Sequence, residues 1–379
     1  TIIVVVLTTL LTGCTGKEPN EIAYVVALGI DSTDDDNYKI TIQYANTTQI
    51  SGGASESGGK AGSEIVDNVT IEAPNIYAGV GLANNIVSKS FSMSHAKLIV
   101  FSKEVAEKGV KDMIETLVRS EEIRPDVFIA VANTTANDYL TSVNPEMEVN
   151  PAQYYQLIYQ KNQLVGIPDG QLREFFTGLY TDNYDSILPV AGVIEGSGGN
   201  SQNDDKGQSK DSQNEGSEGS SESLDSFESK NSDENEKEKD AEKNTSKYEY
   251  DIKNYVGGET AIEKKNKAEA IGAAVFEKDK MVGELGEVET EICKMLKGDY
   301  TYSYLTYYNN DTPDIPITVK TTQQKKPKYK IDTDKKTVDI ELYIESDLYS
   351  LPADYNVENK IEDFERDVAN YTSSTCTEF

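Results

Sequence analysis

The pattern of apolar and polar residues divides the first half of the chain into alternating strands and helices. Residues 22–30 form a continuous apolar run, and residues 38–44 alternate apolar and polar side chains, which predicts a strand and a returning strand in a hairpin. The same pattern predicts further elements: helices at 74–87, 103–119, 135–143, 151–163 and 169–180, and strands at 95–102, 127–132 and 187–194. Because strands alternate with helices, we expect residues 22–195 to form an α/β domain.

The pattern breaks down after residue 195. Residues 200–243 contain fourteen acidic residues, six lysines and only three apolar side chains. Such a segment cannot bury enough apolar area to offset the entropy of ordering it. We therefore predict a disordered acidic linker at residues 196–258, whose role is either that of a spacer or that of an acidic interaction segment.

Beyond the linker, strand signals dominate. Residues 270–285 predict a hairpin, residues 287–296 predict a helix that ends at Gly298, and further strands are predicted at 315–319, 329–331 and 338–344. We expect a strand-rich antiparallel middle domain at residues 259–346. Residues 347–379 contain a helical pattern and predict the start of an incomplete C-terminal α+β domain, so that the expected fold class is multi-domain α+β and α/β.

Tyrosines are concentrated at the beginning of this strand-rich part. Five of them fall within nine residues: Tyr300, Tyr302, Tyr304, Tyr307 and Tyr308. They could form an exposed recognition surface. Alternatively, they are the alternating side chains of a half-buried strand, an environment in which tyrosine is common.

The N-terminus has the pattern of a lipoprotein signal peptide. Residues 1–11 are uncharged and almost wholly apolar, a length that fits a signal-peptide core and is too short to span a bilayer. The small-residue sequence before Cys14 is typical of a lipoprotein processing site, so we predict lipid attachment at Cys14. Residues 1–14 are then the remnant of the leader and residues 15–21 a tether. The alternative is a buried strand with a chance cysteine.

The net charge limits the possible partners of the protein, and the cysteine content limits its possible disulfide bonds. The formal net charge is −30, which argues against a nucleic-acid-binding or anionic-membrane-binding surface, because phosphates would repel the protein. Apart from Cys14, only Cys293 and Cys376 are present, and they either pair with each other or remain free thiols.

Candidate catalytic chemistry is sparse. His95 is the only histidine, and no cysteine lies near it in sequence to complete a zinc site. The acidic stretch 31–37 is a candidate calcium-binding loop, but it lacks the glycine and the distal glutamate of an EF-hand loop. The sequence contains no serine-hydrolase elbow, Walker A loop or dinucleotide fingerprint. We therefore predict no catalytic, cofactor-binding or metal site, and no cofactor.

Four short motifs follow the candidate lipidation site in a fixed order. They are EIAYVVALGID at 21–31, SHAKLIVF at 94–101 followed by EVAEKGV at 104–110, RSEEIRP at 119–125, and GAAVFEKDKMVGEL at 272–285. This order resembles the Ger(x)C family, the C-subunit lipoproteins of spore germinant receptors. The resemblance covers most of the chain outside the linker.

The resemblance implies a non-enzymatic, lipid-anchored subunit of a nutrient receptor that is required for spore germination. It implies a location on the outer face of the cytoplasmic membrane, which is the spore inner membrane, and assembly with polytopic A- and B-type receptor subunits. It supplies no ligand-binding residues, so no small-molecule ligand is predicted. The alternatives are a solute-binding lipoprotein of a transporter, which usually has two similar α/β lobes, and an anchored cell-wall hydrolase.

Overall fold

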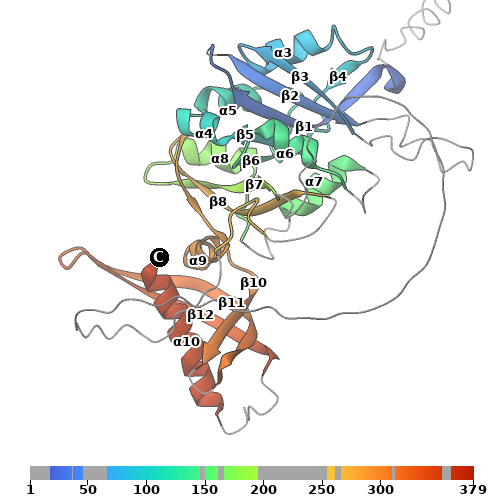
Figure 1. Ribbon diagram of the computed structural model, residues 1–379. Coiled ribbons are helices and arrows are strands. Elements are labelled where there is room, and N and C mark those ends of the chain that lie inside the picture. The colour runs from blue at the N-terminus through green and yellow to red at the C-terminus, as the bar shows by residue number, and fades with distance from the viewer. Residues whose placement is uncertain are drawn as a thin grey trace, which may run out of the picture. The chain divides into compact units, whose positions relative to one another are not determined.

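One large mixed sheet organises the first part of the molecule. The computed structural model describes residues 18–35, 37–45, 66–145, 148, 150–160, 166–194, 254–260, 266–309, 312–351 and 360–379. Within these residues, nine strands form this sheet (Figure 1). A short 3-10 helix, η1 (Pro19–Glu21), precedes the strands, which are β1 (Ile22–Ser32), β2 (Tyr38–Ala45), β3 (Val66–Ala73), β4 (Ser90–Ser92), β5 (Leu98–Ser102), β6 (Phe128–Ala132), β7 (Ser186–Val193), β8 (Ala268–Glu277) and β9 (Lys280–Leu285).

Parallel strands form the centre of the sheet. The spatial order is β3-β2-β1-β5-β6-β7-β8-β9, with β4 beside the start of β1. Strands β1, β5, β6 and β7 are parallel, whereas the pairs at both sides are antiparallel. The connecting helices are α3 (Ile76–Ala83), α4 (Lys103–Lys108), α5 (Lys111–Val118), α6 (Ala136–Ser142), α7 (Pro151–Gln160) and α8 (Leu172–Leu179).

Helices cover both faces of the central strands, so these strands have two buried faces. In β5, Ile99 and Phe101 join the core that contains residues of α4 and α5, while Leu98 and Val100 join the core that contains residues of α6 and α7. This follows from the two-residue period of a strand, which sends successive side chains to opposite faces. It also explains why these strands are continuous apolar runs in the sequence.

The hairpin β8–β9 belongs to this first sheet, which corrects its assignment to a separate middle domain. β8 pairs antiparallel with β7, with Leu188 opposite Ala274. Residues 254–258, which we assigned to the linker, also contact the sheet, because the Gly257 N–H donates to the Ile271 carbonyl at 3.1 Å. The rest of the predicted linker, residues 196–253, lies outside the described residues.

A second sheet and the last helix share a core of their own. The remaining elements are α9 (Glu287–Lys297), β10 (Tyr302–Asn309), β11 (Thr312–Asp332), β12 (Thr337–Ser350) and α10 (Ile361–Glu378). Strands β10, β11 and β12 form an antiparallel sheet. Its core combines Tyr307, Ile317 and Val319 with Phe364, Val368 and Tyr371 of α10. The closing helix therefore packs on the strands of the expected middle domain, and the fold is mixed α/β and α+β as predicted.

The helix expected at residues 103–119 is two helices. Gly109 separates α4 from α5 with a φ of +118°, a conformation that L side chains rarely adopt. The apolar spacing continues across this break, with Val105 and Ile114 both in the same core. Because the apolar spacing is continuous, the sequence predicted one helix where the structure has two.

Candidate functional site

Cys14, the one site residue predicted from the sequence, lies outside the described residues. The described chain begins at Glu18 and enters β1 at Ile22 through η1. Lipid attachment at Cys14 therefore stays a prediction. The four sequence motifs, in contrast, lie within the described residues.

The first motif joins β1 to helix α6. The buried carboxylate of Asp31 accepts hydrogen bonds from the backbone N–H groups of Ala136 and Asn137, at 2.6 and 3.1 Å. Burial raises the pKa of Asp31, although these two hydrogen bonds counteract the shift. Gly29 lets the helix approach closely, since a Cβ there would lie 3.0 Å from Leu140 Cδ1. Both residues thus hold α6 against the sheet.

The third motif contacts the residue that directly precedes the second motif. The backbone N–H of Met93, which precedes the second motif, donates to the Glu122 carboxylate at 2.6 Å. In the same loop, the Ser120 hydroxyl accepts hydrogen bonds from the N–H groups of Glu122 and Ile123, both at 3.2 Å. Residues 119–125 are therefore an ordered loop attached to the segment that leads into β5.

His95 has the environment of a surface residue. Its ring lies edge-on to Tyr24 with centroids 4.7 Å apart, and its Nδ1 is 3.0 Å from the Ser94 hydroxyl. The side chain is exposed. Within the described ranges, no group of three or more His, Cys, Asp or Glu side chains is placed to hold a metal ion.

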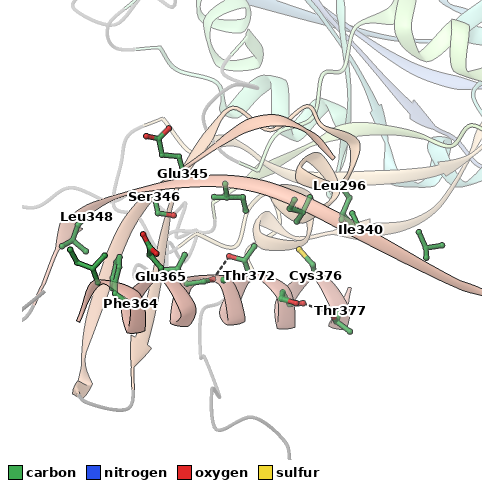
Figure 2. A pocket seen from close by; sticks show the side chains of 17 residues that line it. Leu296, Ile340, Glu345, Ser346, Leu348, Phe364, Glu365, Thr372, Cys376 and Thr377 are labelled. Atoms are coloured by element: carbon green, nitrogen blue, oxygen red, sulfur yellow. Dashed lines mark hydrogen bonds between the residues drawn. The ribbon is translucent and has the colours of Figure 1, made fainter. Parts of the chain in front are cut away.

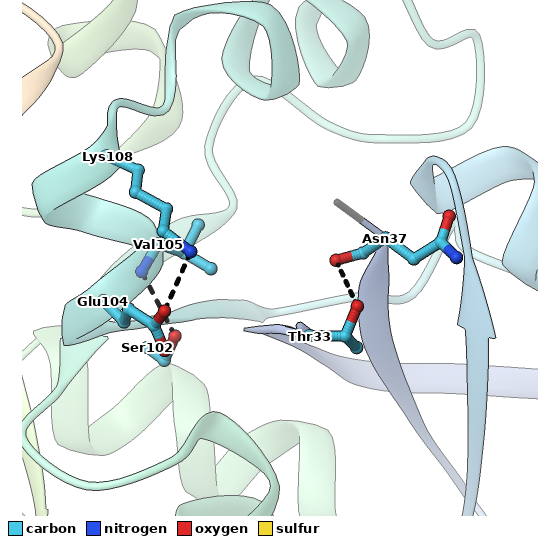
Figure 3. A network of polar contacts seen from close by, with 6 residues as sticks. All are labelled: Thr33, Asn37, Ser102, Glu104, Val105 and Lys108. Atoms are coloured by element: carbon cyan, nitrogen blue, oxygen red, sulfur yellow. Dashed lines mark hydrogen bonds and ion pairs between the residues drawn. The ribbon is translucent and has the colours of Figure 1, made fainter. Parts of the chain in front are cut away.

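The acidic turn between β1 and β2 is closed by its own hydrogen bonds. The Thr33 N–H and hydroxyl donate to the Asn37 carbonyl at 3.2 and 3.0 Å (Figure 3). Figure 3 also shows the start of α4, where the Ser102 hydroxyl accepts from the Val105 N–H and Lys108 pairs with Glu104 at 2.8 Å. These contacts stabilise the turn and the helix end.

The fourth motif contacts the junction of α4 and α5, where the second motif ends. The Val110 N–H donates to the Asp279 carbonyl at 3.0 Å, and a Cβ on Gly109 would lie 2.7 Å from Asp279 Oδ2. Lys103 of α4 forms an ion pair with Glu284 of β9 at 3.0 Å. The hairpin from beyond the linker is thus fixed to the motif helix by both backbone and charge.

Ionisable groups are buried where α9 meets its neighbours. Burial raises the pKa of Glu291 to about 7, while a hydrogen bond from the Ser303 hydroxyl at 2.7 Å acts in the opposite direction. Burial lowers the pKa of Lys294, whose Nζ donates to the Ile167 carbonyl at 3.2 Å. Both side chains are held by these hydrogen bonds to neighbouring elements, so we assign them to structure.

An apolar groove lies between β12 and α10 (Figure 2). Its volume is about 1030 Å³, and its walls include Ile340, Leu348, Phe364 and Cys376. Burial raises the pKa of the Cys376 thiol, which disfavours the reactive thiolate. Cys293 and Cys376 are both free thiols. The groove therefore offers apolar contact area and no activated nucleophile.

The tyrosine cluster divides between core and surface. Tyr300 and Tyr307 are buried, whereas Tyr304 is largely exposed and lies edge-on to Tyr349 of β12. The side chain of Tyr308 lies outside the description. Alternation on a half-buried strand accounts for this division better than a wholly exposed recognition surface does.

Comparison with known proteins identifies the family. A family model described as "Spore germination protein N-terminal domain" matches residues 16–193, and one described as "Spore germination B3/ GerAC like, C-terminal" matches residues 271–379. The chain belongs to the Ger(x)C family of spore germination proteins. The two matches lie on either side of the acidic segment.

Several relatives match part of the chain. Spore germination protein KC of Bacillus subtilis (strain 168) is 28% identical over 162 residues, which are 39% of this chain and 40% of that protein. Spore germination protein B3 of the same organism is 26% identical over 148 residues, 36% of each chain. Spore germination protein GerQC of Bacillus cereus is 26% identical over 104 residues, 27% of this chain and 29% of that one. The chain thus matches about two fifths or less of the length of these relatives.

One solved structure also aligns with the chain. The crystal structure of the GerBC protein aligns with 93% of this chain and 79% of its own, with a TM-score of 0.44 and 14% sequence identity. Among the helices of the described part, none is both long and apolar enough to cross a membrane.

Proposed function

We propose that this chain is a lipid-anchored, non-enzymatic subunit of a spore germinant receptor and is required for germination. The observation that carries the proposal is the pair of family matches, which lie in the same order as the motifs and follow the candidate lipidation site Cys14. In this proposal the lipid holds the chain on the outer face of the spore inner membrane. There it assembles with polytopic A- and B-type receptor subunits.

The structural contacts made by the motif residues support a subunit that acts by binding other proteins and not by catalysis. Asp31, Gly109 and Glu122 all make hydrogen bonds or close contacts that fix one element to another. None of them lies in an arrangement of a nucleophile with a base, which enzymes of the hydrolase classes need. In this proposal the function depends on contact surfaces for other subunits and on attachment to the membrane. A solute-binding protein of a transporter is a weaker alternative, because the described residues contain one large α/β sheet and no second α/β lobe.

The membrane anchor is tested by the substitution Cys14→Ala in the full-length precursor. We expect the variant to move from the membrane fraction to the soluble fraction, because the acyl chains that hold the protein would be lost. Cys376→Ala is the matched control, since it removes a thiol that we do not expect to be acylated. Unchanged membrane retention of Cys14→Ala would refute the anchor.

Partner identity requires a separate measurement. We expect the tagged chain, purified from spore inner-membrane extract, to recover polytopic receptor subunits identified by mass spectrometry. Recovery of transporter subunits in their place would favour the solute-binding alternative. A germination assay with spores that lack the gene would then test whether the subunit is required.

A further inference from the structure

Helix α3 and the turn after it present an uncharged surface to solvent. Residues 73–88 contain no Asp, Glu, Lys or Arg, although 27% of the chain is charged. Surface helices ordinarily place charged side chains on the outer face. Here the outward side chains include Tyr77, Leu82 and Ile86, which are 38%, 49% and 69% exposed and which we call the α3 face.

The α3 face lies beside the point where the chain enters the first sheet. β4 runs parallel to the start of β1, with Ser90 opposite Ile22. The Phe91 N–H donates to Asn84 Oδ1 at 2.8 Å, which ties β4 back to the end of the helix. Ile86 precedes Ser90 by only four residues, so it is held near the first residue of β1.

The proposed lipid would keep this end of the sheet close to the bilayer. Ile22 lies eight positions after Cys14 in the sequence, and a fully extended chain over eight positions spans at most about 29 Å. Any shorter path of the tether brings the start of β1 closer to the lipid. In this proposal, the protein surface around the start of β1 therefore lies close enough to the bilayer to contact it.

We propose that the α3 face rests on the lipid bilayer beside the Cys14 anchor, with Leu82 and Ile86 in the interfacial region. The inference rests on the proposed lipid attachment and goes beyond it, since an anchor alone does not orient a protein. A net charge of −30 keeps most of the surface away from anionic lipid, whereas the side chains of Leu82 and Ile86 carry no ionised group that would have to be desolvated.

The absence of tryptophan from the chain permits a direct test. A single reporter, Ile86→Trp, is introduced into the lipidated full chain, which is reconstituted in phosphatidylcholine vesicles with ordinary or brominated acyl chains. We expect a blue shift of the tryptophan emission and quenching by the brominated lipid, because tryptophan partitions into the interfacial region.

Val282→Trp in β9 is the matched control. Val282 is also apolar and 61% exposed, but β9 lies five strands from β1, which corresponds to about 24 Å across the sheet. We expect neither a blue shift nor quenching at this position. Leu82→Trp serves as a second reporter should Ile86→Trp alter the thermal unfolding of the protein.

The outcomes separate the anchor from the face. Anchored protein whose Ile86→Trp and Leu82→Trp emission is unquenched would overturn the lipid contact and leave the proposed function intact. Retention of Cys14→Ala on the vesicles would contradict the anchor, and unquenched Ile86→Trp emission in that retained variant would overturn the lipid contact as well. A blue shift that occurs only in membranes carrying receptor subunits, and never in pure lipid, would assign the α3 face to a protein partner and overturn the lipid contact.

Discussion

At the level of single residues, Gly29 and Asp31 determine how helix α6 meets the sheet. Gly29 leaves room for Leu140 and Ala136, while Asp31 accepts two backbone hydrogen bonds at the start of the helix. The Gly-Ile-Asp sequence near the end of the first strand therefore specifies a docking site for the helix. Packing and hydrogen bonding within the fold account for these two residues without a ligand.

A pair of glycine substitutions tests the close approach at Gly29. Gly29→Ala would place a Cβ 3.0 Å from Leu140 Cδ1 and 3.1 Å from Ala136 Cβ, so we expect a loss of about 1–3 kcal/mol in the free energy of unfolding. Gly81→Ala is the control, because nothing lies within 4 Å of its Cβ and it lies in a helix. It should stabilise the protein by about 0.5–1 kcal/mol. Equal effects of both substitutions in urea denaturation would contradict the packing argument.

At the level of elements, the β8–β9 hairpin is fixed by its contact with the junction of α4 and α5. Gly109→Ala would force a side chain into a backbone with a φ of +118° and place its Cβ 2.7 Å from Asp279 Oδ2. We expect a loss of about 1–3 kcal/mol, measured by chemical denaturation. Gly283→Ala in β9 is the matched control, since its Cβ would meet nothing within 4 Å. A loss at Gly283 as large as that at Gly109 would show that the hairpin itself, and not its junction, is sensitive.

Local patterns predicted most of the elements. The buried strands β1, β5, β6 and β7 were predicted because burial on both faces demands continuous apolar runs. Helix α9 was predicted together with its end, since Gly298 adopts the left-handed conformation that terminates the helix, with a φ of +77°. These features depend on neighbours in sequence.

Features that depend on distant partners were not predicted. Strand β3 was missed although Val69, Ile71 and Ala73 alternate with polar residues along it, which is the pattern of a half-buried strand. The pairing of β8 with β7 was missed because the alternation within a hairpin does not specify its neighbour. The α3 face was not predicted from the sequence either, because the exposure of Leu82 and Ile86 is known only once the helix is placed on the sheet.

At the level of the whole molecule, Glu291 connects α9 to strand β10 of the second sheet and makes stability depend on pH. Its ordinary pKa is 4.5, and burial raises the pKa in the folded protein to about 7. Between these values the folded state holds a proton that the unfolded state has lost. The free energy of unfolding contributed by this group therefore falls as pH rises through this window.

Glu291→Gln removes this titration while keeping a group that can accept a hydrogen bond from Ser303. We expect wild type to lose up to about 3 kcal/mol relative to the variant between pH 5 and pH 8, measured by urea denaturation at both values. Glu345→Gln on β12 is a suitable control, since this glutamate lies in a different part of the second sheet and contacts Gln324. Identical pH slopes for wild type and Glu291→Gln would exclude Glu291 as the titrating group.

The pairing of β7 with β8 has a consequence for how this chain tolerates change. The strands are neighbours in space, yet more than seventy residues separate Val193 from Ala268 in the sequence. The entropy of closing such a connection grows only with the logarithm of its length, so each doubling costs about 0.6 kcal/mol. Insertions and deletions within residues 196–253, outside the segment 254–258 that contacts the sheet, are therefore expected to change the free energy of unfolding little.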